Sequence, residues 1–258
     1  MKINLNYFWI IVFVNVVTIR TDVFSTFAVA FPNAGFNQLL MVSRQVVSST
    51  PTSSGSITTS IENENDDVEV YQSTLWYDGE YNHGDLYFGA HNGDPVWGAF
   101  RFRIPTAIPA GANITSAVFS MYGIGEYYWQ ADSYLIILAN DASNASQVNG
   151  IDDVPGGANN NYFTSAPGLT SGGASVSVRW PSSGGLNWDM SETVPNISSD
   201  LSSIIQFLVN KYGGLSAGSY VQLWIYTDYV RSDGPEVSGR DYGHPTTPAP
   251  MLSINWQK

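Results

Sequence analysis

Residues 108–122 read IPAGANITSAVFSMY, and this stretch carries the features that decide the fold. Pro109 and Gly111 form a turn signal, because proline fixes one backbone angle and glycine adopts conformations that a Cβ opposes. The residues that follow are rich in β-branched and aromatic side chains, and we expect Ile114 and Phe119 to enter a hydrophobic core. The stretch therefore predicts a turn that leads from one strand into the next.

Short runs typical of strands recur on both sides of this stretch, with turn residues between them. The expected strands lie at 56–61, 86–88, 96–103, 114–122, 134–138, 174–180, 220–226 and 251–256. One helix is expected over 200–211, where apolar residues recur at helical spacing between a possible cap at Ser198-Ser199 and an end at Gly213-Gly214. The sequence predicts an all-β, antiparallel, jelly-roll-like β-sandwich with one short helix and an N-terminal extension.

The composition excludes several classes of protein. The 258 residues include no cysteine, which rules out disulfides, thiolate metal sites and cysteine nucleophiles. The formal net charge of −12 would repel a phosphate backbone, so we expect no nucleic-acid partner. A charged share of only 12% with 14% aromatic residues favours an extracellular all-β protein.

The first 30 residues resemble a secretory signal peptide. Lys2 precedes an apolar run at 7–17 that is too short to cross a bilayer as a helix, and Ala28-Val29-Ala30 is a small-x-small cleavage site. We expect cleavage after Ala30 and a secreted or cell-surface protein with no membrane span in its mature form. The alternative is that this run is a buried N-terminal strand or helix.

Residues 31–56 are predicted to form an N-terminal arm and a Ser/Thr-rich linker, ahead of a sandwich domain at 57–258. The arm contains a strand-like apolar stretch at 38–47. This stretch is either an edge strand of the chain's own sheet or a strand given to a neighbouring subunit, which can build a fibre. The residues that would carry such self-assembly are Leu39, Leu40, Val42 and Val46.

The body of the chain resembles secreted bacterial β-sandwich modules of largely unknown function. These are similar to the jelly rolls of carbohydrate-binding modules and to those found beside polysaccharide lyases. The matching segments are NDDVE at 65–69, GAFRF at 98–102, IPAGANITSA at 108–117, NDAS at 140–143, VRWP at 178–181, PNISSDLSSIIQ at 195–206 and PAPMLSINW at 248–256. The resemblance implies a sandwich over roughly residues 57–257.

Acidic residues cluster between positions 62 and 94, and carboxylates without cysteine or paired histidine suit Ca²⁺. A structural calcium site is one interpretation, and solvated acidic loops are the other. Val70-Tyr71 stand where the resemblance implies further acidic residues, so a metal site of that group is only partly present. The best calcium ligands are Asp66, Asp67, Glu69 and Asp85.

Aromatic groups and glycosylation sequons complete the candidate binding features. Exposed rings can stack on sugars, although core packing or a subunit interface explains aromatic groups equally well. The loop that would bind carbohydrate contains Tyr127, Tyr128 and Trp129. The N-x-S/T sequons, which would make the chain a glycoprotein in a glycosylating host, begin at Asn113, Asn144 and Asn196.

No catalytic pattern stands out. Residues 214–218 spell G-x-S-x-G, but a predicted helix precedes them and a strand follows, which is the wrong order for a nucleophile elbow. The histidines at 83, 91 and 244 form no metal-binding pair. We therefore expect a non-catalytic extracellular structural or surface protein that forms a homo-oligomer or filament, through N-terminal strand exchange. The alternatives are a carbohydrate-binding module with glycan partners and, less favoured, a polysaccharide-degrading enzyme.

Overall fold

The computed structural model describes residues 16–19, 22–29, 40–45, 53–71, 74–77, 85–91, 94–123, 134–149, 176–227, 236–240 and 247–258. The chain divides into two compact units, Met1–Thr52 and Ser53–Lys258. In the first unit, β1 (Val16–Ile19), β2 (Asp22–Val29) and β3 (Leu40–Gln45) form an antiparallel sheet in the order β1-β2-β3. β1 and β2 lie within the predicted signal peptide, and β3 lies within the strand-like part of the arm.

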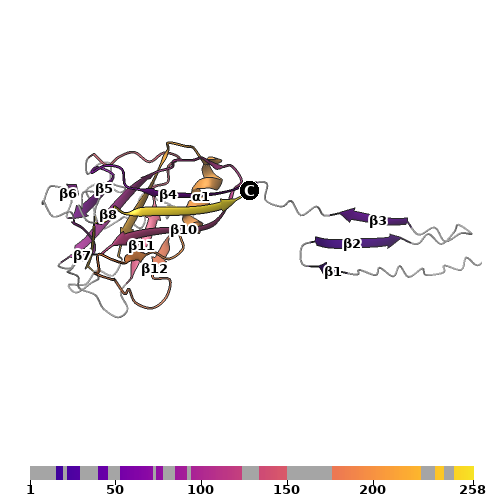
Figure 1. The fold of residues 1–258 in the computed structure, drawn as a ribbon, viewed down its shortest axis with the longest axis horizontal. Helices are drawn as coiled ribbons and strands as arrows, with labels where there is room; N and C mark the ends of the chain where they lie inside the picture. Colours follow the sequence, from indigo (N-terminus) through magenta and orange to yellow (C-terminus); the bar gives the residue numbers. More distant parts are fainter. Residues whose placement is uncertain are drawn as a thin grey trace, which may run out of the picture. The chain divides into compact units, whose positions relative to one another are not determined.

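The second unit confirms the all-β prediction and contains two main antiparallel sheets arranged as a sandwich (Figure 1). The smaller sheet has the order β13 (Pro195–Ile197), β10 (Asn113–Tyr122), β17 (Met251–Gln257) and β4 (Ser54–Ser60). The larger sheet has the order β12 (Val178–Trp180), β11 (Leu135–Ala139), β15 (Tyr220–Tyr226), β8 (Asp94–Arg103), β5 (Asp67–Tyr71) and β6 (Thr74–Tyr77).

Two further strands extend the larger sheet, and a short ribbon accompanies the helix. β7 (Asp85–His91) pairs with the start of β8 and with β16 (Glu236–Arg240). The ribbon joins β9 (Ile108–Pro109) to β14 (Gly214–Leu215), and α1 (Ser202–Tyr212) ends just before β14. Each strand expected from the sequence of the sandwich corresponds to one of these strands, with ends that differ by a few residues.

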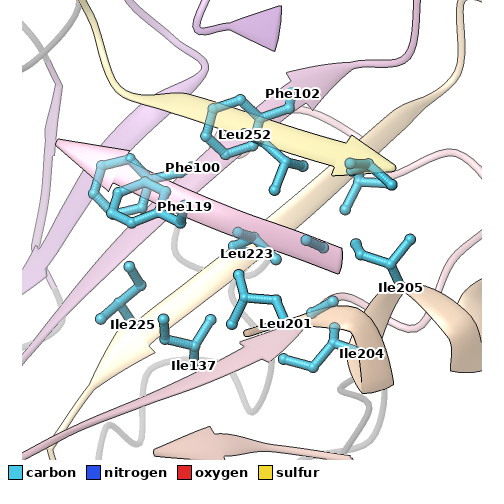
Figure 2. Close-up of a cluster of buried hydrophobic side chains, with 14 of the residues drawn as sticks. Phe100, Phe102, Phe119, Ile137, Leu201, Ile204, Ile205, Leu223, Ile225 and Leu252 are labelled. Atoms are coloured by element: carbon cyan, nitrogen blue, oxygen red, sulfur yellow. The ribbon is translucent and has the colours of Figure 1, made fainter. Parts of the chain in front are cut away.

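The main hydrophobic core lies between the two sheets and under the helix. Phe100 and Phe102 of β8 face Phe119 of β10, and the Phe100 and Phe119 ring centroids are 4.9 Å apart. Figure 2 shows these rings beside Leu252 of β17, with Ile204 and Ile205 reaching in from α1. The helix thus closes the core, and Ile114 and Phe119 are buried as the sequence predicts.

A second hydrophobic cluster lies on the opposite face of the larger sheet. Along β8, Trp97 and Ala99 belong to this cluster, whereas Phe100 and Phe102 belong to the main core. The Trp97 ring stacks on Tyr226 of β15 with centroids 3.9 Å apart. Both faces of the central strands are therefore buried, which explains why YVQLWIY at 220–226 alternates only loosely in polarity.

The turn predicted at Pro109 and Gly111 is confirmed. Gly111 has φ +72°, a left-handed conformation that side chains with a Cβ disfavour, and the Ala112 N–H donates to the Pro109 carbonyl at 3.1 Å. The chain then enters β10, which pairs with β17 along most of its length. This turn sets where the central strand of the smaller sheet begins.

The predicted sandwich boundary at residue 57 falls inside β4. The Ser53 and Lys258 backbones exchange hydrogen bonds of 3.0 and 2.7 Å. The pairing of β4 with β17 therefore begins at Ser53, the first residue of the second unit. Gly55 lies under the Trp256 ring, where an added Cβ would come within 2.0 Å of the ring. The last three residues of the predicted arm and linker, positions 54–56, therefore belong to a strand of the sandwich.

The helix is confirmed, but the predicted cap is wrong. Leu201 occupies the N-cap position without a side-chain hydrogen bond, and the Asp200 carboxylate accepts instead from the Ser202 N–H at 3.0 Å. Ser198 instead contacts β10, because its Oγ accepts a hydrogen bond from the Phe119 N–H at 3.0 Å. The helix ends as expected at Gly213, which has φ 69° and donates its N–H to the Val209 carbonyl.

Side chains around the helix start complete the edge of β10 where β13 stops. Asp200 Oδ1 accepts from the Ala117 N–H at 2.9 Å, and Gln206 Oε1 accepts from the Ile114 N–H at 2.8 Å. Gln206 Nε2 also donates to the Ala112 carbonyl at 3.0 Å. The side chains of residues 198–206 thereby continue the pairing of β10 after the short strand β13 ends.

We predict that Asp200→Asn makes stability depend less on pH. Burial raises the pKa of Asp200, but hydrogen bonds from Ala117 and Ser202 outweigh this effect and the net direction is downward. A lowered pKa stabilises the fold above the unfolded value of about 3.9, and this contribution disappears as pH falls through the folded value. Because Asp200 is largely exposed, we expect the substitution to lower the free energy of unfolding at pH 7 by only about 1 kcal/mol. Urea unfolding measures this difference.

The same measurement near pH 3 should show a smaller difference between Asp200→Asn and the parent protein. Glu64→Gln is the matched control, since Glu64 is exposed and lies outside this edge. A loss that is equal at both pH values would contradict the role of the Asp200 charge.

Candidate functional site

The most concentrated polar network lies at the start of β5, on the outer face of the larger sheet. Arg101 on β8 donates from its backbone N–H to the Asp66 carbonyl at 2.7 Å and from Nη1 to Asp66 Oδ1 at 2.6 Å. The Asp66 side chain is fully buried, and the Arg101 side chain is 13% exposed. The guanidinium carbon lies 3.4 Å from the centroid of the Tyr220 ring, which covers its flat face.

This network also holds the loop 140–149 against the sheet. Arg101 Nε donates to the Ala145 carbonyl at 2.9 Å, and the Ala145 N–H donates to the Tyr220 carbonyl at 2.9 Å. Asn144 Oδ1 accepts from the Tyr220 N–H at 2.9 Å, and the Asn140 N–H donates to the Gln222 carbonyl at 2.8 Å. The loop therefore lies along β15 with Val148 in the second hydrophobic cluster.

The start of the loop 140–149 contacts the helix. Lys211 forms an ion pair with Asp141, and Tyr212 Oη donates to the Asp141 carbonyl at 2.7 Å and to its Oδ1 at 2.9 Å. Burial, and then the hydrogen bond to Asp141, raise the pKa of Tyr212. The hydrogen bond to Asp141 is the main cause of the raised pKa of Lys211. These contacts hold the end of α1 to the start of the loop.

The predicted calcium ligands are placed in different surroundings. Asp66 is held by Arg101 and by Asn63, so a cation there would have to displace a guanidinium. Glu69 Oε2 accepts from the Tyr87 N–H at 3.0 Å, and Asp67 is fully buried. The Asp85 side chain lies outside the described residues. No group of three acidic or histidine side chains suited to a metal ion occurs in the part of the chain described, and the calcium site stays a prediction from the sequence.

Two aromatic side chains outside the predicted carbohydrate-binding loop, Trp188 and Tyr226, are buried. Trp188 is 3% exposed and packs against Phe88 and Trp180, with ring centroids 5.7 and 5.4 Å apart. Tyr226 is 4% exposed and lies under Trp97. Tyr127, Tyr128 and Trp129 lie outside the described residues. These two rings therefore serve packing, and the carbohydrate-binding prediction rests on sequence alone.

The G-x-S-x-G segment at 214–218 lies after a helix and before a strand, as the sequence predicts. α1 precedes Gly214, β15 follows, and the Ser216 carbonyl accepts from the Ser219 N–H and Oγ at 3.1 and 2.7 Å. This is a tight turn between two short elements. The histidine side chains at 83, 91 and 244 lie outside the described residues.

The predicted assembly residues lie partly in β3. Leu40 and Val42 belong to this strand, and Leu39 and Val46 lie outside the described residues. β3 is an edge of its sheet, since β2 is its one partner among the described strands. Sequence reasoning missed β5 and the Asp66–Arg101 pair, although the alternating Val68 and Val70 signal a strand.

No family model matches this chain, and no curated protein is significantly similar to it. No helix among the described residues is long and apolar enough to cross a membrane. The class that the structure defines is that of an all-β sandwich protein with a separate N-terminal sheet.

We predict that Asp66→Asn destabilises the fold by about 3 kcal/mol, because it leaves the mostly buried Arg101 without its counter-charge. Arg101→Met should cost a similar amount, and the double variant should cost clearly less than the sum, as urea unfolding would measure. Glu64→Gln is again the control. Additive losses, or a calcium-dependent rise in Tm that Asp66→Asn removes, would contradict the ion pair as the function of Asp66.

We also predict which sequons a glycosylating host would use. Asn113 and Asn144 are exposed, whereas Asn196 is 7% exposed, accepts from the Asp189 N–H at 2.7 Å and donates to the Asp189 carbonyl at 2.8 Å. A glycan on Asn196 would be attached to Nδ2, the buried atom that donates to the Asp189 carbonyl, and would need space that this contact occupies. Peptide mapping should find glycan at Asn113 and Asn144 with Asn196 unmodified, and a fully occupied Asn196 in the folded protein would contradict the structure.

Proposed function

We propose that this protein is a non-catalytic structural subunit that is exported and self-assembles outside the cell through the strand-forming part of its N-terminal arm. The observation that carries this proposal is the division of the chain into a sandwich and a separate small sheet with β3 at its edge. A strand at a sheet edge presents unpaired backbone groups that another chain can satisfy.

Cleavage after Ala30 would strengthen this tendency. It would remove β1 and β2, and with β2 the partner of β3 in the first unit. The mature chain would then begin with an arm whose apolar strand has lost its pairing. Such a strand can add to the edge of another sheet, where its backbone groups find new partners and its apolar side chains leave water.

The test is to purify the exported protein, determine its first residue and image it by negative stain. We expect a chain that starts at Phe31 and forms filaments, whereas a variant without residues 31–50 stays monomeric. The control is Ser43→Thr, which keeps the strand character of β3. Filaments that persist after the deletion, or a parent protein that stays monomeric at high concentration, would refute the proposal.

A further inference from the structure

β4 differs from the other edge strands of the sandwich in length and chemistry. It has seven residues, SGSITTS, with neither a charge nor a proline. β12 and β13 have three residues each, and β13 begins with Pro195. β6 has four residues, and β16 has five with Glu236 and Arg240 at its ends. Short length, proline and charge are the usual protections of an edge, and β4 has none of them.

The register shows which backbone groups of β4 are available. Ser53 and Lys258 exchange both hydrogen bonds, so the antiparallel alternation turns the backbone groups of the odd-numbered residues toward β17. The groups of the even-numbered residues point away from the sheet. No described residue pairs with this outer edge, and the side chains along it are exposed; the residues are Ser54, Ser56, Thr58 and Ser60.

The opposite edge of the same sheet is completed. β13 pairs with Ser120–Tyr122 of β10, and Ser198, Asp200 and Gln206 accept from the backbone N–H groups further along it. One end of the smaller sheet is thus closed within the chain, and the β4 end is open in the part that the structure describes.

We propose that the outer edge of β4 is the acceptor site for strand β3 of a second copy of this chain. This inference rests on the proposed function and assigns the surface that receives the donated strand. The contact is heterologous, because donor and acceptor are different parts of the chain. Each copy then has a free donor and a free acceptor, so the assembly grows head to tail as an open filament.

Charge favours β3 as the occupant over a second β4. Arg44, within β3, is the one charged residue of positions 31–52, whereas positions 53–258 hold 7 basic and 21 acidic residues, a net charge of −14. Pairing two β4 edges would bring two strongly acidic sandwiches together. A weakly basic arm meets no such repulsion.

The alternation of β3 sets which face it would turn to solvent. Positions 40, 42 and 44 share one face, and positions 41, 43 and 45 share the other. Ile57 and Thr59 are buried on the core side of β4, so Leu40 and Val42 extend the apolar side best when they share that side. Positions 41, 43 and 45 then lie on the side of Thr58.

The first test changes the acceptor backbone. Thr58→Pro removes an outward N–H without removing a bond to β17, and Thr58→Val is the matched control that keeps the N–H but loses the Thr58–Ser253 hydroxyl contact. In the exported protein, which we expect to begin at Phe31, Thr58→Pro with unchanged circular dichroism should slow filament growth at least tenfold, while Thr58→Val grows like the parent. Equal growth of the folded proline variant would overturn the inference.

The second test does not depend on how the proline variant folds. Because the chain has no cysteine, a full-length Thr58→Cys protein can be mixed with full-length proteins that carry a cysteine at one position from 40 to 45. We expect mixed disulfide dimers at positions 41, 43 or 45, where the Cα atoms come within about 7 Å.

The outcomes separate the two proposals. Disulfides between two Thr58→Cys chains alone, disulfides formed within one doubly substituted chain on dilution, or filaments without any β3–β4 disulfide would overturn the acceptor assignment and leave self-assembly standing. A parent protein that forms no filaments would instead overturn the proposed function on which the inference rests.

Discussion

This sandwich depends on one constraint: the backbone N–H and C=O groups at the edges of its sheets need hydrogen-bond partners. At β10 the solution comes from one continuous segment, residues 195–206, which supplies a short strand, three accepting side chains and the start of a helix. The same segment places Ile204 and Ile205 in the core. The contacts that complete the edge of β10 and the packing that closes the core therefore depend on each other. A change in the edge contacts would therefore also displace the helix.

The larger sheet differs from the smaller one because hydrophobic clusters cover both of its faces. β8 gives alternate residues to the main core and to the second cluster, and Arg101 comes next on the outer side, where an apolar residue would extend that cluster. The buried Asp66 carboxylate and the Tyr220 ring make this position acceptable for a charge. The loop 140–149 then covers the junction of the polar and apolar halves, so the ion pair supports the loop as well as the sheet.

The sequence predicts the features that depend on local chemistry and misses those that depend on pairing. The Pro109–Gly111 turn, the helix and the strands with clear apolar runs are visible because each is specified within about ten residues. β5 was interpreted as an acidic opening, because its acidic residues drew more weight than the strand-like alternation of Val68 and Val70. Asp66 and Arg101 are 35 positions apart, and only the β5–β8 register brings them together, so the sequence does not reveal this ion pair.

The absence of cysteine has a consequence for a chain that we propose to be exported. A sandwich without disulfides depends on its two hydrophobic clusters and on contacts such as Arg101–Asp66, which join segments distant in the sequence. Among the described strands, β17 is the one that pairs with β4, and Trp256 lies over Gly55 on the core side. A strand added to the outer edge of β4 would pair its remaining backbone groups and reduce its fraying. Assembly would then also stabilise each subunit at the edge that the fold leaves weakest, because a partner that binds only the folded state shifts the unfolding equilibrium.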